Sequence, residues 1–150
     1  MKPLQKASKF AFGLLVTALA LDGSSQARRR TWKSQTTGNE YRVWVEKDAF
    51  HAEWVNVPED MARHGAYLHT LCRYTGSKWV GTSESLLPCT EGEGPDQRTV
   101  NWCKLQTRTE IDSIARDRIT GRGQTIKRVD CQSCKPLETG WAAFVWVPKR

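Results

Sequence analysis

The chain has 150 residues, of which 39% are hydrophobic and 26% are charged. This length allows one domain, and this composition excludes collagen-like, low-complexity and fully disordered proteins. The formal net charge of +7 favours anionic partners such as nucleic acid, acidic polysaccharide or membrane headgroups, although a solvated basic surface explains the same balance.

The first residues are typical of an export signal. Lys2, Lys6 and Lys9 precede an apolar block at 10–21, which is short for a transmembrane helix but has the usual length of a signal-peptide core. We therefore predict a signal peptide over 1–27, cleaved after residue 27 or alternatively after residue 20, with an uncleaved anchor helix as the competing interpretation. No later apolar run approaches the about 18 residues that span a bilayer. We expect a secreted or periplasmic protein.

The next segments are typical of β-structure. Residues 28–40 are basic and polar and are expected to form an N-terminal arm. Residues 41–46 and 49–55 alternate apolar and polar side chains on either side of a short polar break, which predicts a β-hairpin. Residues 59–64 follow a proline and precede a glycine, the order expected around a single helical turn.

The rest of the chain continues in hairpins. A second hairpin is expected around the turn at 75–77, and a third tight turn between Ile114 and Ile119. Gly121 and Gly123 are expected at a bend or bulge of the strand that follows. The segments expected as strands are 65–74, 78–87, 100–111, 119–126 and 141–147.

The pattern as a whole predicts an all-β fold. Roughly seven or eight strands joined by short turns form an antiparallel meander, which must close on itself to bury its apolar face. We predict a single domain over 41–150 that closes into a small barrel, with a two-sheet sandwich as the alternative. The order is similar in outline to a lipocalin meander, but Thr31-Trp32-Lys33 lacks that family's Gly-x-Trp signature, so no family is assigned.

The five cysteines predict disulfide bonds, because thiols usually pair outside the cytoplasm. If the strands around the loop at 90–96 are neighbours, Cys89 and Cys103 lie across from each other and form the first bridge. The second bridge is expected to join Cys72 to Cys131 or Cys134, which leaves the other cysteine free. The Cys131-Gln-Ser-Cys134 motif has no second ligand pair for zinc, no following histidine for haem and no helix for redox catalysis. No metal and no cofactor are expected.

Tryptophans are the best candidates for ligand binding. Trp44 and Trp102 fall on the opposite strand face from apolar neighbours such as Val43 and Cys103, and Trp146 likewise alternates with two valines. Such rings stack on sugars or bases, or line an apolar pocket. The alternative is that the sheet packs on both faces, or that residues 28–40 cover these rings.

Basic side chains give a second candidate site. Arg118, Arg122 and Arg128 share one parity, and Arg116 lies in the turn before them. Together they are a candidate anion-binding face.

These features support three hypotheses about function. The first is an exported β-domain that binds a small apolar or glycan ligand without catalysis. The second is a structural or interaction protein of the cell envelope whose basic face binds an anionic polymer. The third is a small secreted hydrolase such as a nuclease, for which His51, Glu53 and Arg73 would have to meet on one sheet face. No catalytic residue is assigned, because no motif with a built-in mechanism is present.

Overall fold

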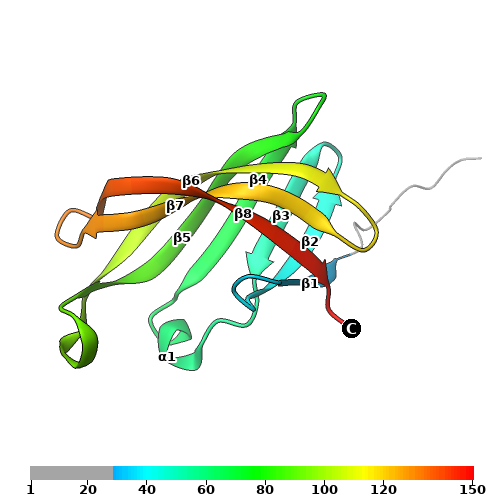
Figure 1. Ribbon diagram of the computed structural model, residues 1–150. Helices are drawn as coiled ribbons and strands as arrows, with labels where there is room; N and C mark the ends of the chain where they lie inside the picture. Colours follow the sequence, from blue (N-terminus) through cyan, green and yellow to red (C-terminus); the bar gives the residue numbers. More distant parts are fainter. Residues whose placement is uncertain (1–28) are drawn as a thin grey trace, which may run out of the picture.

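The computed structural model describes residues 29–150, so the expected signal peptide at 1–27 lies outside the described residues. Each strand pairs antiparallel with the next, and the first pairs with the last, so the sheet closes into an eight-stranded barrel (Figure 1). This confirms the predicted barrel over the alternative sandwich. The elements are β1 (Arg30–Ser34), β2 (Glu40–Glu46), β3 (Ala49–Trp54), α1 (Glu59–Ala62), β4 (Tyr67–Tyr74), β5 (Trp79–Glu91), η1 (Gly94–Asp96), β6 (Arg98–Ile114), β7 (Ile119–Asp130) and β8 (Lys135–Pro148).

Strand β1 lies within the segment expected as an arm. Its residue Trp32 pairs with Tyr41 of β2 and with Pro148 of β8, so β1 completes the ring. Trp32 and Ser34 are buried, whereas Lys33 between them is exposed, which is the alternation of a half-buried strand. The sheet therefore begins at Arg30 and not at residue 41.

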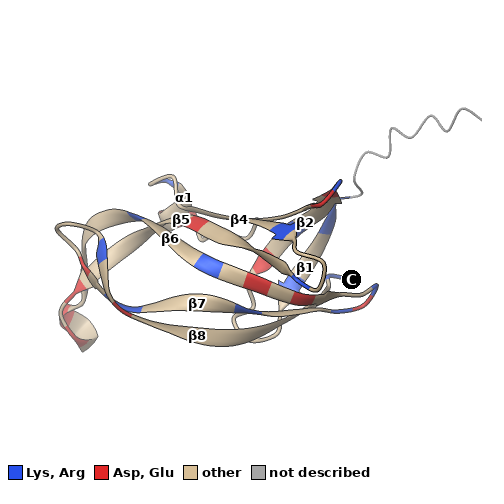
Figure 2. Ribbon diagram, turned by 90° about the horizontal axis from the view of Figure 1, so that it is seen from above, with Lys and Arg blue, Asp and Glu red and all other residues tan. Residues whose placement is uncertain are grey.

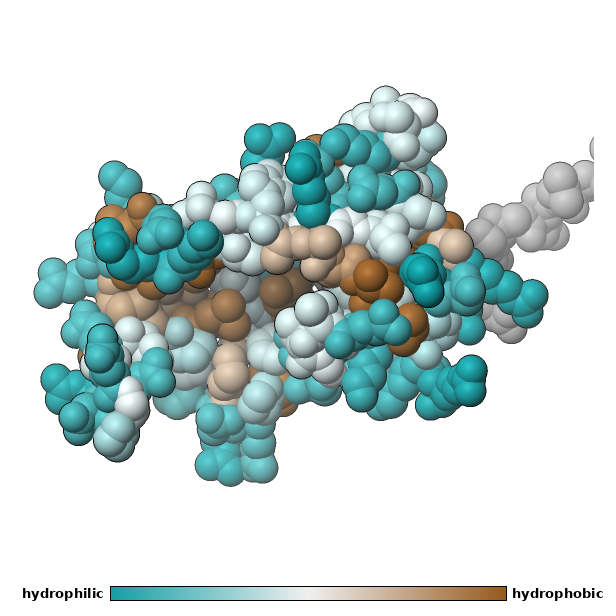
Figure 3. All heavy atoms as spheres, in the orientation of Figure 1, coloured by the Kyte–Doolittle hydropathy of each residue, from teal (hydrophilic) through white to brown (hydrophobic). Residues whose placement is uncertain are grey.

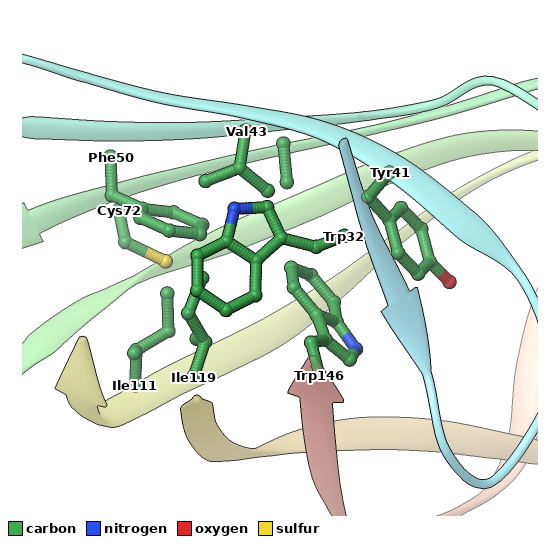
Figure 4. Close-up of a cluster of buried hydrophobic side chains, with 9 residues drawn as sticks. Trp32, Tyr41, Val43, Phe50, Cys72, Ile111, Ile119 and Trp146 are labelled. Carbon is green, nitrogen blue, oxygen red and sulfur yellow. The ribbon is translucent and has the colours of Figure 1, made fainter. Parts of the chain in front are cut away.

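The hydrophobic core fills the part of the barrel nearest β1. Figure 4 shows the Trp32 ring in the middle of this cluster, with side chains from several strands directed toward it. Phe50, Ile111 and Ile119 are fully buried. Burying one such side chain stabilises the fold by about 1.5–3 kcal/mol. The core members are Trp32, Tyr41, Val43, Phe50, Ala52, Cys72, Ile111, Ile119 and Trp146.

Two long hairpins extend past the shorter strands (Figure 1). Strands β5 and β6 pair along nearly their whole lengths, and so do β7 and β8. Strands β6 and β7, however, pair only where Thr109–Ile114 meets Ile119–Gly123. Beyond Gly123 the two hairpins are therefore not joined by a backbone ladder. Within the described residues, no helix has the length and apolarity needed to cross a membrane.

Two disulfides join these hairpins and correct the predicted pairing. Cys89 is bonded to Cys131 and Cys103 to Cys134, with Cα–Cα distances of 5.6 and 5.2 Å. The remaining cysteine, Cys72, is free and buried. The predicted Cys89–Cys103 and Cys72–Cys131 or Cys72–Cys134 bridges are therefore wrong.

The sheet register explains this outcome. Cys103 lies opposite Leu87, and Cys89 lies opposite Asn101, so the two cysteines of the β5–β6 hairpin are offset along it. Both side chains are buried beneath the turn that joins β7 to β8, and this turn carries the other two cysteines. Cys72 instead faces the hydrophobic core, away from this turn.

Candidate ligand site in the barrel interior

The barrel interior contains two adjoining hollows. One, of about 260 Å³, reaches the β1–β2 loop at Thr36 and Thr37. The other, of about 150 Å³, reaches the wall formed by β4, β5 and β6. Figure 3 shows the molecule hollowed on one face, with hydrophobic side chains inside the hollow. The residues shared by both linings are Tyr41, Gly123, Gln124, Phe144 and Trp146.

One side of the hollow is aromatic. The rings of Tyr41 and Trp146 stack with their centroids 4.4 Å apart, and those of Phe144 and Trp146 lie 4.9 Å apart. All three side chains occupy inward positions of β2 and β8. Burial raises the pKa of Tyr41, so the phenol stays neutral and its hydroxyl remains able to donate a hydrogen bond. The site thus offers a ring surface with a polar edge.

The opposite side of the hollow carries a chain of hydroxyl groups. Thr70 Oγ1 and Ser83 Oγ lie 2.6 Å apart, and Ser83 Oγ and Thr109 Oγ1 lie 2.8 Å apart. These residues stand on the adjacent strands β4, β5 and β6. Three hydroxyl groups carry three hydrogens, and two internal bonds use only two of them. One donor therefore remains for a further acceptor.

The hollow is electrically neutral. Its lining, as far as the structure describes the chain, contains hydroxyl, amide, aromatic and aliphatic side chains but no acidic or basic one. Transfer of an unpaired charge into such surroundings costs several kcal/mol. A ligand that fits this lining is neutral and has both an apolar face and groups that form hydrogen bonds.

The three tryptophans predicted to bind ligand lie in three separate places. Trp146 is buried at the interior site. Trp44 lies on the outer face of β2, stacked on His51 with centroids 4.8 Å apart. Trp102 lies on the outer face of β6, stacked on His64 at 4.5 Å. Trp44 and Trp102 lie on the outer face, opposite the buried Val43 and Cys103, but the three rings form no shared platform.

Trp102 has its own cleft. The rings of Trp102 and His64 border a space of about 350 Å³ between α1 and the outer face of the barrel. Asp60 and Met61 of the α1 segment form one side, and Pro88 of β5 is also part of the lining. The cleft is larger than either interior hollow, but His64 stacks on one face of the Trp102 indole and closes that face to a sugar.

The arginines predicted to bind anions are spread along β7 and the turn before it. The backbone carbonyl of Arg116 accepts a hydrogen bond from Arg30 at 3.1 Å, and Arg118 lies in the same turn. Arg122 is ion-paired with Glu110 at 2.8 Å and covers the Trp141 ring. Figure 2 shows acidic and basic residues interspersed on the long strands. In the register of β7 and β8, Arg128 is paired with Glu138. The anion-binding face stays a prediction.

The residues proposed for hydrolysis are partly brought together. His51 and Glu53 extend from the outer face of β3, and Arg73 forms an exposed ion pair with Asp48 at 3.3 Å. The side chain of His51 is in contact with His69, a residue that this hypothesis did not pair with it.

Most residues of the interior site were not predicted from the sequence. Tyr41 and Phe144 were not assigned a role, and neither were Thr70, Ser83 and Thr109. The available signal was the presence of small hydroxyl residues at inward positions of consecutive strands, where a packed barrel would carry larger apolar ones. In comparisons with protein-family models, curated proteins and solved structures, no match to this chain was found.

Proposed function

We propose that this protein is an exported, non-catalytic binding protein that holds a small neutral ligand in its barrel. The observation that carries the proposal is the uncharged hollow with stacked rings of Tyr41, Phe144 and Trp146 on one side and the Thr70–Ser83–Thr109 hydroxyl chain on the other. Rings that present one apolar face and several hydroxyl groups, such as sugars and aromatic alcohols, match this combination.

The size of the hollows narrows the ligand class. Pockets for drug-sized molecules have about 300–1,000 Å³. The hollows of about 260 and 150 Å³ are smaller than this, although they adjoin. The ligand is therefore of the size of one or two sugar rings.

The two disulfides support the export part of the proposal. Such bonds form and persist in oxidising compartments and are rare in the cytosol. In this proposal residues 1–27 direct the chain out of the cytoplasm and are removed.

The test is a fluorescence titration with neutral monosaccharides, their methyl glycosides and aromatic alcohols. A ligand in the hollow lies against Trp146 and changes its emission in a saturable way. Thr109→Val removes one hydroxyl at nearly constant shape and is expected to weaken binding about two- to tenfold, the worth of one hydrogen bond. Gly123→Val places a side chain in open space inside the hollow and is expected to abolish binding.

The matched control is Trp44→Phe, which changes a ring on the outer face and is expected to leave the titration intact. Loss of the response in Trp44→Phe, with Gly123→Val unaffected, would place the ligand on the outside and refute the proposal. Absence of any response across the three ligand classes would also refute it. Thermal unfolding of each variant checks that the barrel is intact.

A further inference from the structure

Two histidines form a close pair on the outside of the barrel, on the opposite face of the sheet from the hollow. His51 of β3 and His69 of β4 are both half-buried, and Nδ1 of His51 lies 3.4 Å from Nε2 of His69. The two rings are nearly parallel, at an interplanar angle of 15°. In the register of β3 and β4, His51 is paired with Leu71 and His69 with Glu53, so the two histidines are diagonal neighbours on one face of the sheet.

This spacing suits metal coordination. Two nitrogen ligands, each about 2.0–2.1 Å from a zinc ion and separated by a tetrahedral angle, are about 3.3 Å apart. The observed 3.4 Å between the two ring nitrogens is close to this value. A hydrogen bond between the rings places one proton between the two facing nitrogens. A metal ion binds both facing nitrogens when each neutral ring carries its own proton on its other nitrogen.

We propose that His51 and His69 form a binding site for a divalent transition-metal ion of the zinc, nickel and copper group, whose common ligand is imidazole. The described residues contain no cluster of three or more His, Cys, Asp or Glu side chains arranged around a metal. Water therefore fills the remaining coordination positions. Glu53 extends from the same face and is paired with His69 in the strand register.

The site has a built-in reporter. Trp44 stacks on His51 with an interplanar angle of 1° and on His69 at 15°, with centroids 4.8 and 6.3 Å away. A copper(II) ion bound by the two imidazoles lies close to this indole and quenches its fluorescence. Zinc, which has a filled d shell, binds without this paramagnetic effect.

The experiment is isothermal titration calorimetry of the full chain, without a polyhistidine tag, with zinc chloride in a non-chelating buffer at pH 7.5. One ion per chain is expected. His51→Ala and His69→Ala are each expected to weaken binding at least tenfold. The third histidine gives the matched control: His64→Ala changes an exposed residue beside α1 and is expected to bind zinc as the unaltered chain does.

A second measurement separates this site from other metal-binding groups. Copper(II) chloride is expected to quench part of the tryptophan fluorescence, and Trp44→Phe is expected to remove that part while calorimetric zinc binding persists. The proposal fails if zinc does not bind, if His51→Ala and His69→Ala bind as tightly as the unaltered chain, or if His64→Ala weakens binding equally.

Discussion

Removing one disulfide is expected to destabilise the protein by an amount set by the covalent ring that the bridge closes. Cys89–Cys131 and Cys103–Cys134 span 42 and 31 residues. Either bridge alone lowers the entropy of the unfolded chain and thereby raises its free energy by about 4 kcal/mol. The two bridges interleave along the chain, since Cys103 lies between Cys89 and Cys131, and Cys131 lies between Cys103 and Cys134. When one is present, the other closes a ring of about 17 residues made of segments 89–103 and 131–134, which is worth about 3 kcal/mol.

The expected costs of the variants follow from this interleaving. The alanine pair at positions 103 and 134 removes one bridge and is expected to lower the free energy of unfolding by about 3 kcal/mol. The alanine pair at positions 89 and 131 removes the other bridge and is expected to cost about the same. Alanine at all four positions is expected to cost about 7 kcal/mol, which is more than the two pairs combined, because the first bridge always closes the larger ring.

A double variant that takes one cysteine from each bridge tests the observed disulfide connectivity. Cys89→Ala with Cys103→Ala takes one sulfur from each observed bridge, so both bridges are lost and the cost approaches that of the fourfold variant. Unfolding is followed by tryptophan fluorescence in urea without reductant, in a Cys72→Ala background that prevents thiol exchange. If the mismatched pair costs no more than a matched pair, the connectivity on which this reasoning depends is wrong.

Three further predictions concern the rest of the barrel. Burial raises the pKa of Cys72 to about 12, so iodoacetamide at pH 8 is expected to modify no thiol in the native protein and one after denaturation, as counted by mass spectrometry. Hydrogen bonds from Lys78 and Arg122 hold the pKa of Glu110 below its ordinary 4.5. The stabilisation from the ionised form is therefore present above about pH 4.5 and disappears as the pH falls through the lowered pKa. Thermal melts should show Glu110→Gln less stable than the unaltered chain at pH 7, with the difference closing in acid; a difference independent of pH would contradict this. A Cβ at Gly121 would collide with backbone atoms of β6, so Gly121→Ala is expected to lose about 1–3 kcal/mol. Gly123→Ala meets nothing within 4 Å and serves as its control in urea unfolding; equal losses would exclude the steric explanation.

The alternation of side chains was sufficient to predict the barrel. Val43 and Phe50 were identified as apolar members of alternating runs, and both are buried. The alternation of apolar and polar side chains is weaker where a strand is not half-buried. Residues 135–140 form the first part of β8, but residues 135–139 are exposed, so no periodic apolar pattern marks them. Strand β1 was missed because it is short and the residues before it are basic.

The disulfide pairing could not be obtained by the same reasoning. Alternation places Cys89 and Cys103 on the inner face, but their partners depend on which turn lies over that face. The turn between β7 and β8 reaches them because β6 and β7 separate beyond Gly123. That separation is a property of the closed sheet as a whole, and no local pattern in β5 or β6 encodes it.

The hollow is likewise a consequence of register. Thr70 lies opposite Ser83, and Ser83 lies opposite Thr107, while Thr109 lies opposite Gly123, so small inward residues of four strands meet at neighbouring levels of the barrel. Had β5 been shifted by two residues so that Gly81 took the place of Ser83, the same alternation would hold, but the hydroxyl chain would be broken because glycine has no side chain. Alternation can therefore be read strand by strand, whereas the site exists only because the register of adjacent strands places small residues beside small residues.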